Sequence, residues 1–199
     1  YRIATTYRPT NDMMLFASWS TGFKSGGFDS GGGATVGGQG RKFAAETVEN
    51  IEGGVRSEWF AGRLTANATL LRMDVSNYQF RTYEGISFRA QNNGEIRQQG
   101  VEFDVTARPI APVTLNVAAT YLDSEYLDFR GAPALPAFSG TQDLTGERVP
   151  FSPRWQGVSS AAYDNQLPLN DMSWQIRGDI NFISEQILSS AGDNNPEST

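Results

Sequence analysis

Apolar and polar side chains alternate along most of this chain, which is the period of a β-strand with one face in an apolar environment. Between Val48 and Glu58, for example, Ile51 and Val55 fall on one face, whereas Glu52 and Arg56 fall on the other. The same alternation predicts eight strands, at 1–8, 13–21, 48–58, 63–70, 101–106, 113–121, 154–163 and 172–185. We therefore expect an all-β fold.

The connections between the predicted strands alternate between short and long. Short connections lie at 9–12, 59–62 and 108–112, and a polar turn joins the last two strands. Long connections lie at 22–47, 77–94 and 125–152. They exceed the roughly 12 to 15 residues above which structureless loops are uncommon in compact domains. If all turns lie at one end and all loops at the other, the strands form an antiparallel up-and-down sheet. Two adjacent apolar residues, Leu70 and Leu71, break the alternation and predict a β-bulge.

The two faces of the predicted strands differ in chemistry. One face carries Arg, Glu, Asp, Asn and Thr, as expected for the lumen of a wide membrane barrel, and the other face is apolar and suits lipid. Because lipid forbids unpaired backbone groups, such a sheet must close, either alone or within a larger wall. Aromatic residues at strand ends suit interfacial girdles. These residues are Tyr7, Trp19, Trp59, Tyr121, Trp155 and Trp174. The core of a soluble β-sandwich is the alternative explanation for them.

Composition excludes several classes of protein. The mean hydropathy is -0.41, and the longest apolar run, Met13 to Ala17, is far below the roughly 20 residues of a membrane-spanning helix. The chain has no Cys and no His, which rules out disulfides, Cys or His zinc sites, thiol nucleophiles and Ser-His-Asp triads. The net charge of -6 and the lack of a basic run argue against nucleic acid. We expect no enzyme, no cofactor and no bound nucleic acid.

The two ends of the chain suggest an internal fragment. The first residue is Tyr1, no charged and apolar leader follows it, and residues 194–199 form a turn-like tail. We therefore expect residues 1–199 to be part of a longer protein.

Four stretches carry a more specific pattern. They are Leu15 to Phe28, Phe43 to Ser57, Asn92 to Asp104 and Asp143 to Trp155, with short matches at 63–65 and 78–79 between them. In this order they resemble the β-barrel of TonB-dependent outer-membrane receptors, and the resemblance covers nearly the whole chain. Each motif is weak alone, and the combination is specific for the barrel rather than for a ligand.

The resemblance implies a Gram-negative outer-membrane protein with a 22-stranded barrel and an N-terminal plug in its lumen. Residues 1–199 would be a partial barrel domain of about eight strands, without signal peptide, plug, TonB box or closing C-terminal strand. The implied partners are outer-membrane lipid, the plug of the same parent chain, the TonB complex and a small-molecule ligand such as a metal chelate. A ferric siderophore is the expected cargo because the family often imports one, and cobalamin and oligosaccharides stay open.

Candidate ligand contacts occur in the long connection 77–94. Arg81, Tyr83, Phe88 and Arg89 combine cations with aromatic rings, which suits an anionic aromatic ligand such as a catecholate siderophore. A solvated loop with scattered aromatic residues is the simpler interpretation of the same residues.

Two sets of acidic residues and one glycine-rich run resemble chemical sites, but simpler explanations fit them better. Glu102 and Asp104 share a strand face but have no nucleophile or metal ligands to work with, so lumen solvation or plug contact explains them better. The acidic residues at 123, 125 and 128 match no known calcium loop. The glycines at 26–40 contain neither phosphate-binding motif, which indicates a loop.

Two other functions remain possible at this point. One is a passive porin or a small closed eight-stranded barrel, which a plug upstream of the chain would argue against. The other is a soluble carbohydrate-binding β-sandwich, which must bury its apolar face within its own fold.

Overall fold

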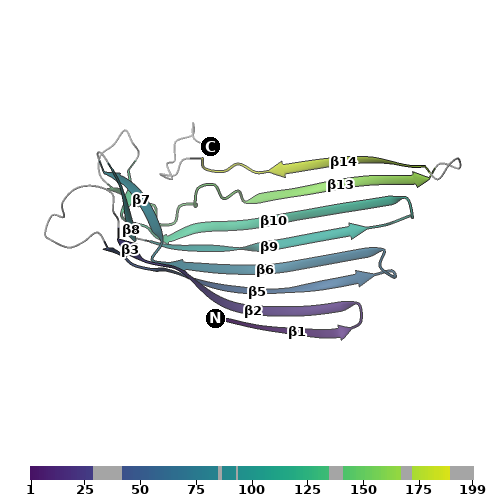
Figure 1. Ribbon diagram of the computed structural model, residues 1–199, viewed down its shortest axis with the longest axis horizontal. Coiled ribbons are helices and arrows are strands. Elements are labelled where there is room, and N and C mark those ends of the chain that lie inside the picture. Colours follow the sequence, from purple (N-terminus) through teal and green to yellow (C-terminus); the bar gives the residue numbers. More distant parts are fainter. Residues whose placement is uncertain (29–41, 85–86, 93, 135–140, 167–171, 189–199) are drawn as a thin grey trace.

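The computed structural model describes residues 1–28, 42–84, 87–92, 94–134, 141–166 and 172–188, and these contain strands but no helix. Accordingly, no helix in these ranges is long and apolar enough to cross a membrane. The main sheet has eight antiparallel strands in the order β1-β2-β5-β6-β9-β10-β13-β14 (Figure 1). Their bounds are β1 Arg2–Thr10, β2 Met13–Lys24, β5 Glu46–Trp59, β6 Leu64–Ser76, β9 Glu95–Ala107, β10 Val113–Asp128, β13 Trp155–Gln166 and β14 Ser173–Ile183. The predicted up-and-down sheet is confirmed.

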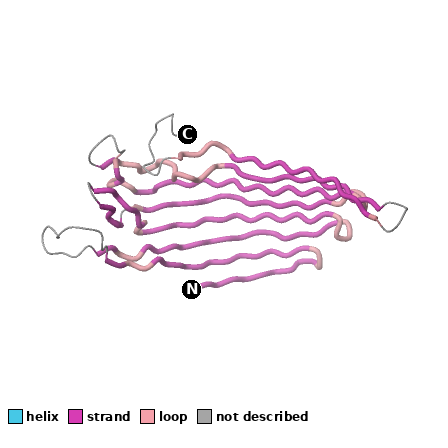
Figure 2. The backbone as a smooth tube through the Cα atoms, turned by 45° about the horizontal axis from the view of Figure 1, so that its top comes forward, coloured by secondary structure: helices cyan, strands magenta, loops and turns pink. Residues whose placement is uncertain are grey.

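The two ends of the sheet differ, as Figure 2 shows. At the turn end the strands are joined by short connections such as 60–63, where Phe60, Ala61 and Gly62 all have positive φ angles of 56°, 54° and 82°. At the loop end the long connections carry three small two-stranded sheets. These are β3 (Gly27–Phe28) with β4 (Lys42–Phe43), β7 (Gln79–Glu84) with β8 (Ser87–Asn92), and β11 (Ala132–Pro133) with β12 (Thr141–Gln142).

The register of the main sheet separates an apolar face from a polar face. Directly paired residues share a face, so one row of paired positions can be followed across all eight strands. One such row is Tyr7, Leu15, Val55, Ala68, Phe103, Ala119, Gly157 and Phe182. Large apolar side chains on this face are exposed in the isolated chain, as with Leu70 at 67% and Ile180 at 68%. A continuous exposed apolar surface of this extent needs lipid or protein to cover it.

Aromatic pairs mark both edges of the apolar band. Tyr121 and Trp155 pair toward the loop end with ring centroids 4.9 Å apart, and Tyr163 and Trp174 pair at the turn end at 5.4 Å. From Trp155 to Tyr163 the strand β13 rises about 26 Å, at about 3.3 Å per residue. Strands of outer-membrane barrels tilt by about 35–45°, so this length corresponds to a height of about 20 Å, comparable with the apolar band of about 25 Å that such barrels present to lipid.

The predicted β-bulge at Leu70 and Leu71 is wrong. The pairing of β6 with both neighbours runs through these positions without a shift, with Gly53 opposite Leu70 and Glu52 opposite Leu71. Leu71 lies on the polar face, and the next residue on the apolar face is Arg72. The alternation breaks because the surroundings of the two faces change at this height, not because the register slips.

The sheet is open among the described residues. The strand β1 pairs with β2 alone and β14 pairs with β13 alone, so each leaves one edge without backbone partners. Unpaired edges cannot face lipid, so these two strands need further strands beside them in the membrane. No second sheet packs on the apolar face within the described ranges, and the β-sandwich interpretation is therefore wrong.

One glycine is required by a close approach between strands. A Cβ atom on Gly54 would collide with the carbonyl oxygen of Ala68 and lie 2.8 Å from the ring of Phe16. The ring of Phe16 occupies the space that the missing side chain leaves on the polar face. The guanidinium carbon of Arg56 lies 5.4 Å from the centroid of the same ring, within the range of a cation–π contact.

Candidate functional site

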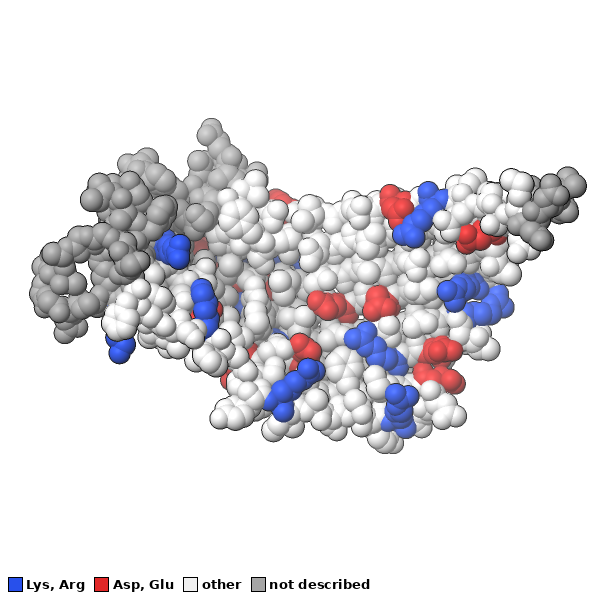
Figure 3. Space-filling view, viewed as in Figure 1, with Lys and Arg blue, Asp and Glu red and all other residues white. Residues whose placement is uncertain are grey.

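The polar face of the sheet carries a ladder of hydrogen bonds between strands. Asn67 Nδ2 donates to Asp104 Oδ2 at 2.7 Å, and the guanidinium of Arg56 lies 3.6 Å from the other oxygen of the same carboxylate. Nearer the turn end, Asn116 accepts from the Thr106 hydroxyl at 2.9 Å and its Nδ2 donates to Ser160 Oγ. Figure 3 shows acidic and basic side chains scattered over the face turned toward the viewer. Such a face suits a hydrated or protein-filled interior and excludes contact with lipid.

Several carboxylates on the polar face have no basic partner within the described part of the chain. Glu52 accepts one hydrogen bond, from Asn50 Nδ2 at 2.6 Å. Glu58 and Glu102 are exposed, and their carboxylates make no hydrogen bond or ion pair with described residues. Arg2 and Arg8 also lie on this face, so its side chains without an ionic partner are of both signs.

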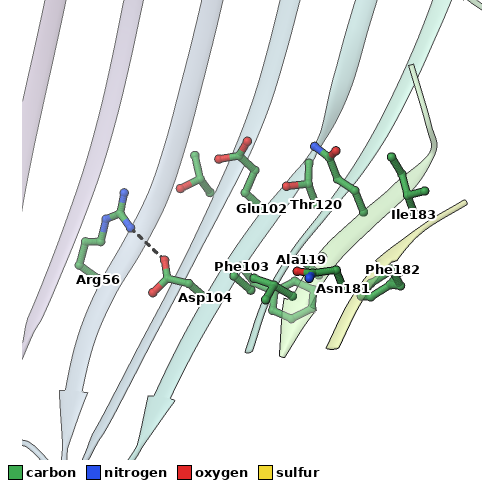
Figure 4. Close-up of a pocket in the computed structure, with 14 residues that line it drawn as sticks. Arg56, Glu102, Phe103, Asp104, Ala119, Thr120, Asn181, Phe182 and Ile183 are labelled. Carbon is green, nitrogen blue, oxygen red and sulfur yellow. Dashed lines mark ion pairs between the residues drawn. The ribbon is translucent and has the colours of Figure 1, made fainter. Parts of the chain in front are cut away.

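An open groove of ≈ 700 Å³ crosses this face from β5 to β14. Its polar lining includes Arg56, Glu102, Asp104, Thr120 and Asn181. In Figure 4 the side chains of Arg56 and Asp104 point toward one another, whereas Glu102 and Thr120 lie together farther along the groove. The predicted lumen position of Glu102 and Asp104 agrees with this arrangement, because both side chains belong to the polar face and line the groove.

The most buried part of the chain lies at the loop end, over the polar face. Its buried members, none more than 8% exposed, are Val75, Ile96, Tyr126, Phe129, Ala132 and Leu144. Val75, Ile96 and Tyr126 form one row of the polar face. The described parts 129–134 and 141–149 of this connection and the start of β7 therefore fold inward and cover the polar face at this end.

Aromatic rings hold the base of the β7–β8 hairpin in this cluster. Phe80 meets Phe129 edge to face at 4.9 Å, and Tyr78 meets the same ring at 6.1 Å. Tyr126 lies 4.8 Å from Phe129. Burial raises the pKa of both Tyr78 and Tyr126, so both phenols are neutral at physiological pH.

Hydrogen bonds tie the same hairpin to the connection between β2 and β5. The side-chain amide of Gln79 donates to Ser25 O at 3.1 Å and to Ala44 O at 2.9 Å, and the Gln79 backbone amide donates to Glu46 Oε2 at 2.8 Å. Asn92, at the other end of the hairpin, accepts from the amide of Ala44. Two long connections thus form one hydrogen-bonded unit.

The predicted ligand contacts lie on this hairpin, which the sequence had indicated as a loop. In its ladder Arg81 pairs with Ala90, Tyr83 with Phe88, and Thr82 with Arg89. Paired positions share a face, so positions 81, 83 and 88 belong to one face and position 89 to the other. Arg81 is exposed, and the side chains at 82–89 lie outside the described residues. Their role as ligand contacts stays a prediction.

Other sequence-based candidates have simpler explanations. Asp123 lies 3.7 Å from Arg154 and Asp128 lies 3.4 Å from Arg130, so each of these two acids faces a cation. Glu125 pairs through its backbone with Arg97 in the ladder and with Arg148 in an isolated bridge. Most of the glycine-rich run 26–40 lies outside the described residues.

The residues that fix the hairpin could not be found from alternation, although 78, 79 and 92 fall in stretches that resemble the family. Gln79 and Asn92 act through single side-chain amides, which leave no periodic signal. Tyr78 and Phe129 lie in connections, and Tyr126 lies near the end of β10, beyond the alternating part of that strand, so only their aromatic character could have indicated a core.

Three features together are typical of one class of protein: an apolar band with aromatic edges, a polar inner face, and long connections at one end. This chain is a segment of an outer-membrane β-barrel, with its loop end on the extracellular side.

The family follows from comparison with known proteins. Residues 1–198 match the family described as TonB dependent receptor-like, beta-barrel, and the chain belongs to that family. The sequence-based identification is thereby confirmed, together with the outer-membrane location. The family is one of receptors and not of enzymes.

Solved structures show the same fold at low sequence identity. The ferric yersiniabactin uptake receptor FyuA of Yersinia pestis matches with a TM-score of 0.72 and 20% identity, and BauA, the ferric preacinetobactin receptor of Acinetobacter baumannii, with 0.71 and 19%. Each match covers 96% of this chain and 26% of the receptor. FpvA of P. aeruginosa, in complex with a pyoverdine and iron, matches at 0.61 and 14% over 100% of this chain and 24% of its own. The chain thus spans about a quarter of the receptors that it resembles.

Proposed function

We propose that the protein containing this chain is a TonB-dependent importer of a ferric siderophore. Membership of the receptor family carries the proposal, and similar folds in receptors of ferric yersiniabactin, ferric preacinetobactin and a ferric pyoverdine support the choice of cargo. In this proposal the segment supplies wall strands, part of the extracellular rim and no catalysis.

The polar face is the proposed seat of a plug domain from the same parent chain. Three carboxylates face the lumen without a basic partner among the described residues, those of Glu52, Glu58 and Glu102. A plug with basic groups at this height would neutralise them. A passive porin would instead leave the face to water. Conductance of the full-length receptor in planar bilayers separates these possibilities: a plugged barrel gives little current, and a large steady conductance contradicts the importer.

The β7–β8 hairpin is the proposed ligand-binding element. Its base is fixed by the aromatic cluster and by Gln79, which reduces the conformational entropy that binding would otherwise cost. From one face of the hairpin, Arg81 would contact anionic groups of the chelate and Tyr83 and Phe88 would contact its rings. Arg89, on the other face, would add a second cation beside the ligand.

Uptake of radiolabelled iron tests both parts of this proposal. The full-length receptor is expressed in a strain without its own siderophore receptors, and a panel of ferric siderophores is offered with and without a protonophore. We expect uptake of at least one chelate that stops when the proton gradient collapses. Uptake that persists without the gradient, or no uptake of any ferric chelate, contradicts the proposed function.

The binding residues are tested separately. The double variant Arg81→Gln/Arg89→Gln is compared with Arg108→Gln, which removes a cation at the opposite, turn end of the sheet. Because a charged hydrogen bond contributes about 1.5–3 kcal/mol, the double variant should bind the transported chelate at least about tenfold more weakly. Equal affinity in all three proteins would show that the hairpin does not contact the ligand.

A further inference from the structure

Two side chains at the base of the β7–β8 hairpin hold one residue of a neighbouring connection. Gln79 begins β7, Asn92 ends β8, and the two are directly paired, so their side chains leave the same face of the hairpin. Gln79 Nε2 donates to Ala44 O at 2.9 Å, and the amide of Ala44 donates to Asn92 Oδ1. We call these two hydrogen bonds the Ala44 clasp. Because both backbone groups of Ala44 are bound, the clasp fixes the orientation of this residue as well as its position.

The side-chain amide of Gln79 also joins the two stems of the connection between β2 and β5. It donates to Ser25 O at 3.1 Å on one stem and to Ala44 O on the other. The stems approach closely, because a Cβ atom on Gly26 would lie 2.5 Å from Phe43 O and 2.8 Å from Ala44 C. The hairpin is therefore bonded to the closed base of this connection and not to a single strand of it.

The small sheet of β3 and β4 follows directly on these stems. In this sheet Gly27 pairs with Phe43 and Phe28 with Lys42, and Ala44 is the residue after β4. The strand β4 lies against β8, and Figure 1 shows β3 beside β7 and β8 at the loop end. The Ala44 clasp thus sets where β3 and β4 lie relative to the hairpin.

Phe28 and Lys42 present an aromatic ring and a cation on one face of this small sheet. They are directly paired and therefore share that face. Phe28 is 76% exposed, and Lys42 is exposed and makes no ion pair within the described residues. An exposed ring beside a free ammonium group suits a ligand that combines negative charge with aromatic rings.

We propose that Gln79 and Asn92 are positioning residues, which place the β3–β4 sheet beside the β7–β8 hairpin. Lys42 and Phe28 on this sheet then form the second half of the ligand site. This inference rests on the proposed function, because it takes the hairpin as the element that binds a ferric chelate. Lys42 contacts an anionic group of the chelate and Phe28 contacts one of its rings. The positioning residues touch no ligand atom and act by reducing the conformational entropy that binding costs.

Binding of ferric chelates to the full-length receptor tests this division of roles. A panel of ferric catecholate, phenolate and hydroxamate chelates is titrated, and the tightest binder is used for all variants. Lys42→Gln removes the proposed contact, and Gln79→Met removes the clasp donor but keeps the length of the side chain. The matched controls are Arg108→Gln at the turn end and Gln99→Met, since Gln99 is exposed and makes no hydrogen bond with its side chain within the described ranges.

We expect Lys42→Gln and Gln79→Met each to weaken binding about tenfold, with both controls like the wild type. The double variant Lys42→Gln/Gln79→Met should bind no more weakly than Gln79→Met, because Lys42 no longer meets the ligand once the clasp is lost. Unchanged affinity in Lys42→Gln would overturn the proposal. Additive losses in the double variant would also overturn it, because they would show that Gln79 does not act through the position of Lys42.

Hydrogen exchange without ligand tests the clasp separately from the proposed function. In Gln79→Met the amide of Ala44 keeps its own acceptor, Asn92 Oδ1, but should exchange about fivefold faster if the two connections open together. Unchanged exchange at Ala44 would overturn the positioning role. A receptor that binds none of the chelates would contradict the proposed function, and exchange at Ala44 would still decide whether Gln79 joins the two connections.

Discussion

Phe129 is the residue whose loss should most weaken the extracellular end. It is 3% exposed and contacts rings from three directions, with Tyr126 at 4.8 Å, Phe80 at 4.9 Å and Tyr78 at 6.1 Å. Replacement of a buried phenylalanine by alanine costs about 3–5 kcal/mol. The eight-stranded sheet does not depend on this ring. The free-energy cost therefore falls on the local packing of residues 129–134 and 141–149 and of the base of the β7–β8 hairpin.

Hydrogen exchange measures this local packing directly. The reporters are amides that close the loops, Leu144 N to Phe129 O at 3.0 Å and Gly146 N to Tyr126 O at 2.7 Å. A loss of 3 kcal/mol corresponds to exchange that is about 100-fold faster at these amides in Phe129→Ala, with little change in the membrane strands. Phe28→Ala, which removes a ring that is 76% exposed at the same end, should leave exchange unchanged. Unchanged exchange in Phe129→Ala, or equal acceleration in both variants, would contradict a role of this ring in holding the loops closed.

Three further predictions concern the sheet and its rim. Gly54→Ala should lower the free energy of unfolding, measured by urea unfolding from lipid vesicles, by about 1–3 kcal/mol, because its Cβ meets a carbonyl oxygen and an aromatic ring. In the same assay Gly178→Ala should be neutral, because its Cβ has no atom within 4 Å. Val117→Arg, at the middle of the apolar band, should cost about 2–4 kcal/mol in the same assay, and Ala118→Arg, whose side chain enters the open groove on the lumen face, should cost little. The hydrogen bond from Arg97 is the main reason that the pKa of Asp74 is lowered, which means that its ionised form stabilises the fold above the unfolded value of 3.8. The difference in melting temperature between wild type and Asp74→Asn should therefore persist from pH 7 to pH 5 and disappear as the pH falls through the folded pKa; a difference independent of pH would contradict it.

The membrane strands could be predicted from the sequence because lipid imposes a strict alternation. Leu115, Val117 and Ala119 occupy one face of β10 and Asn116 the other, as the alternation indicated. The strands extend farther at the loop end than predicted, since β2 continues to Lys24 and β10 to Asp128. In these extensions both faces leave the lipid, so hydropathy no longer reports the strand.

The candidate site was less predictable than the strands. The composition of the connection 77–94 indicated ligand contacts, but its fold as a hairpin depends on Gln79, Asn92 and a ring supplied by Phe129, which is distant in sequence. Contacts of this kind follow from tertiary packing, and no local pattern encodes them.

The break in alternation at Leu71 shows how the chain encodes the height of the membrane. Below it, β6 turns Leu64 and Leu70 outward and Asn67 inward, and above it the strand turns Arg72 outward and Val75 inward. Along β6, the surroundings of the outward face change from lipid to a polar layer. The surroundings of the inward face change from a polar lumen to the buried cluster under the loops. The register is continuous and only the polarity of the two faces is exchanged. An exchange of apolar and charged residues within one long strand, which by sequence alone resembles a bulge, therefore locates the outer edge of the membrane in a barrel of this family.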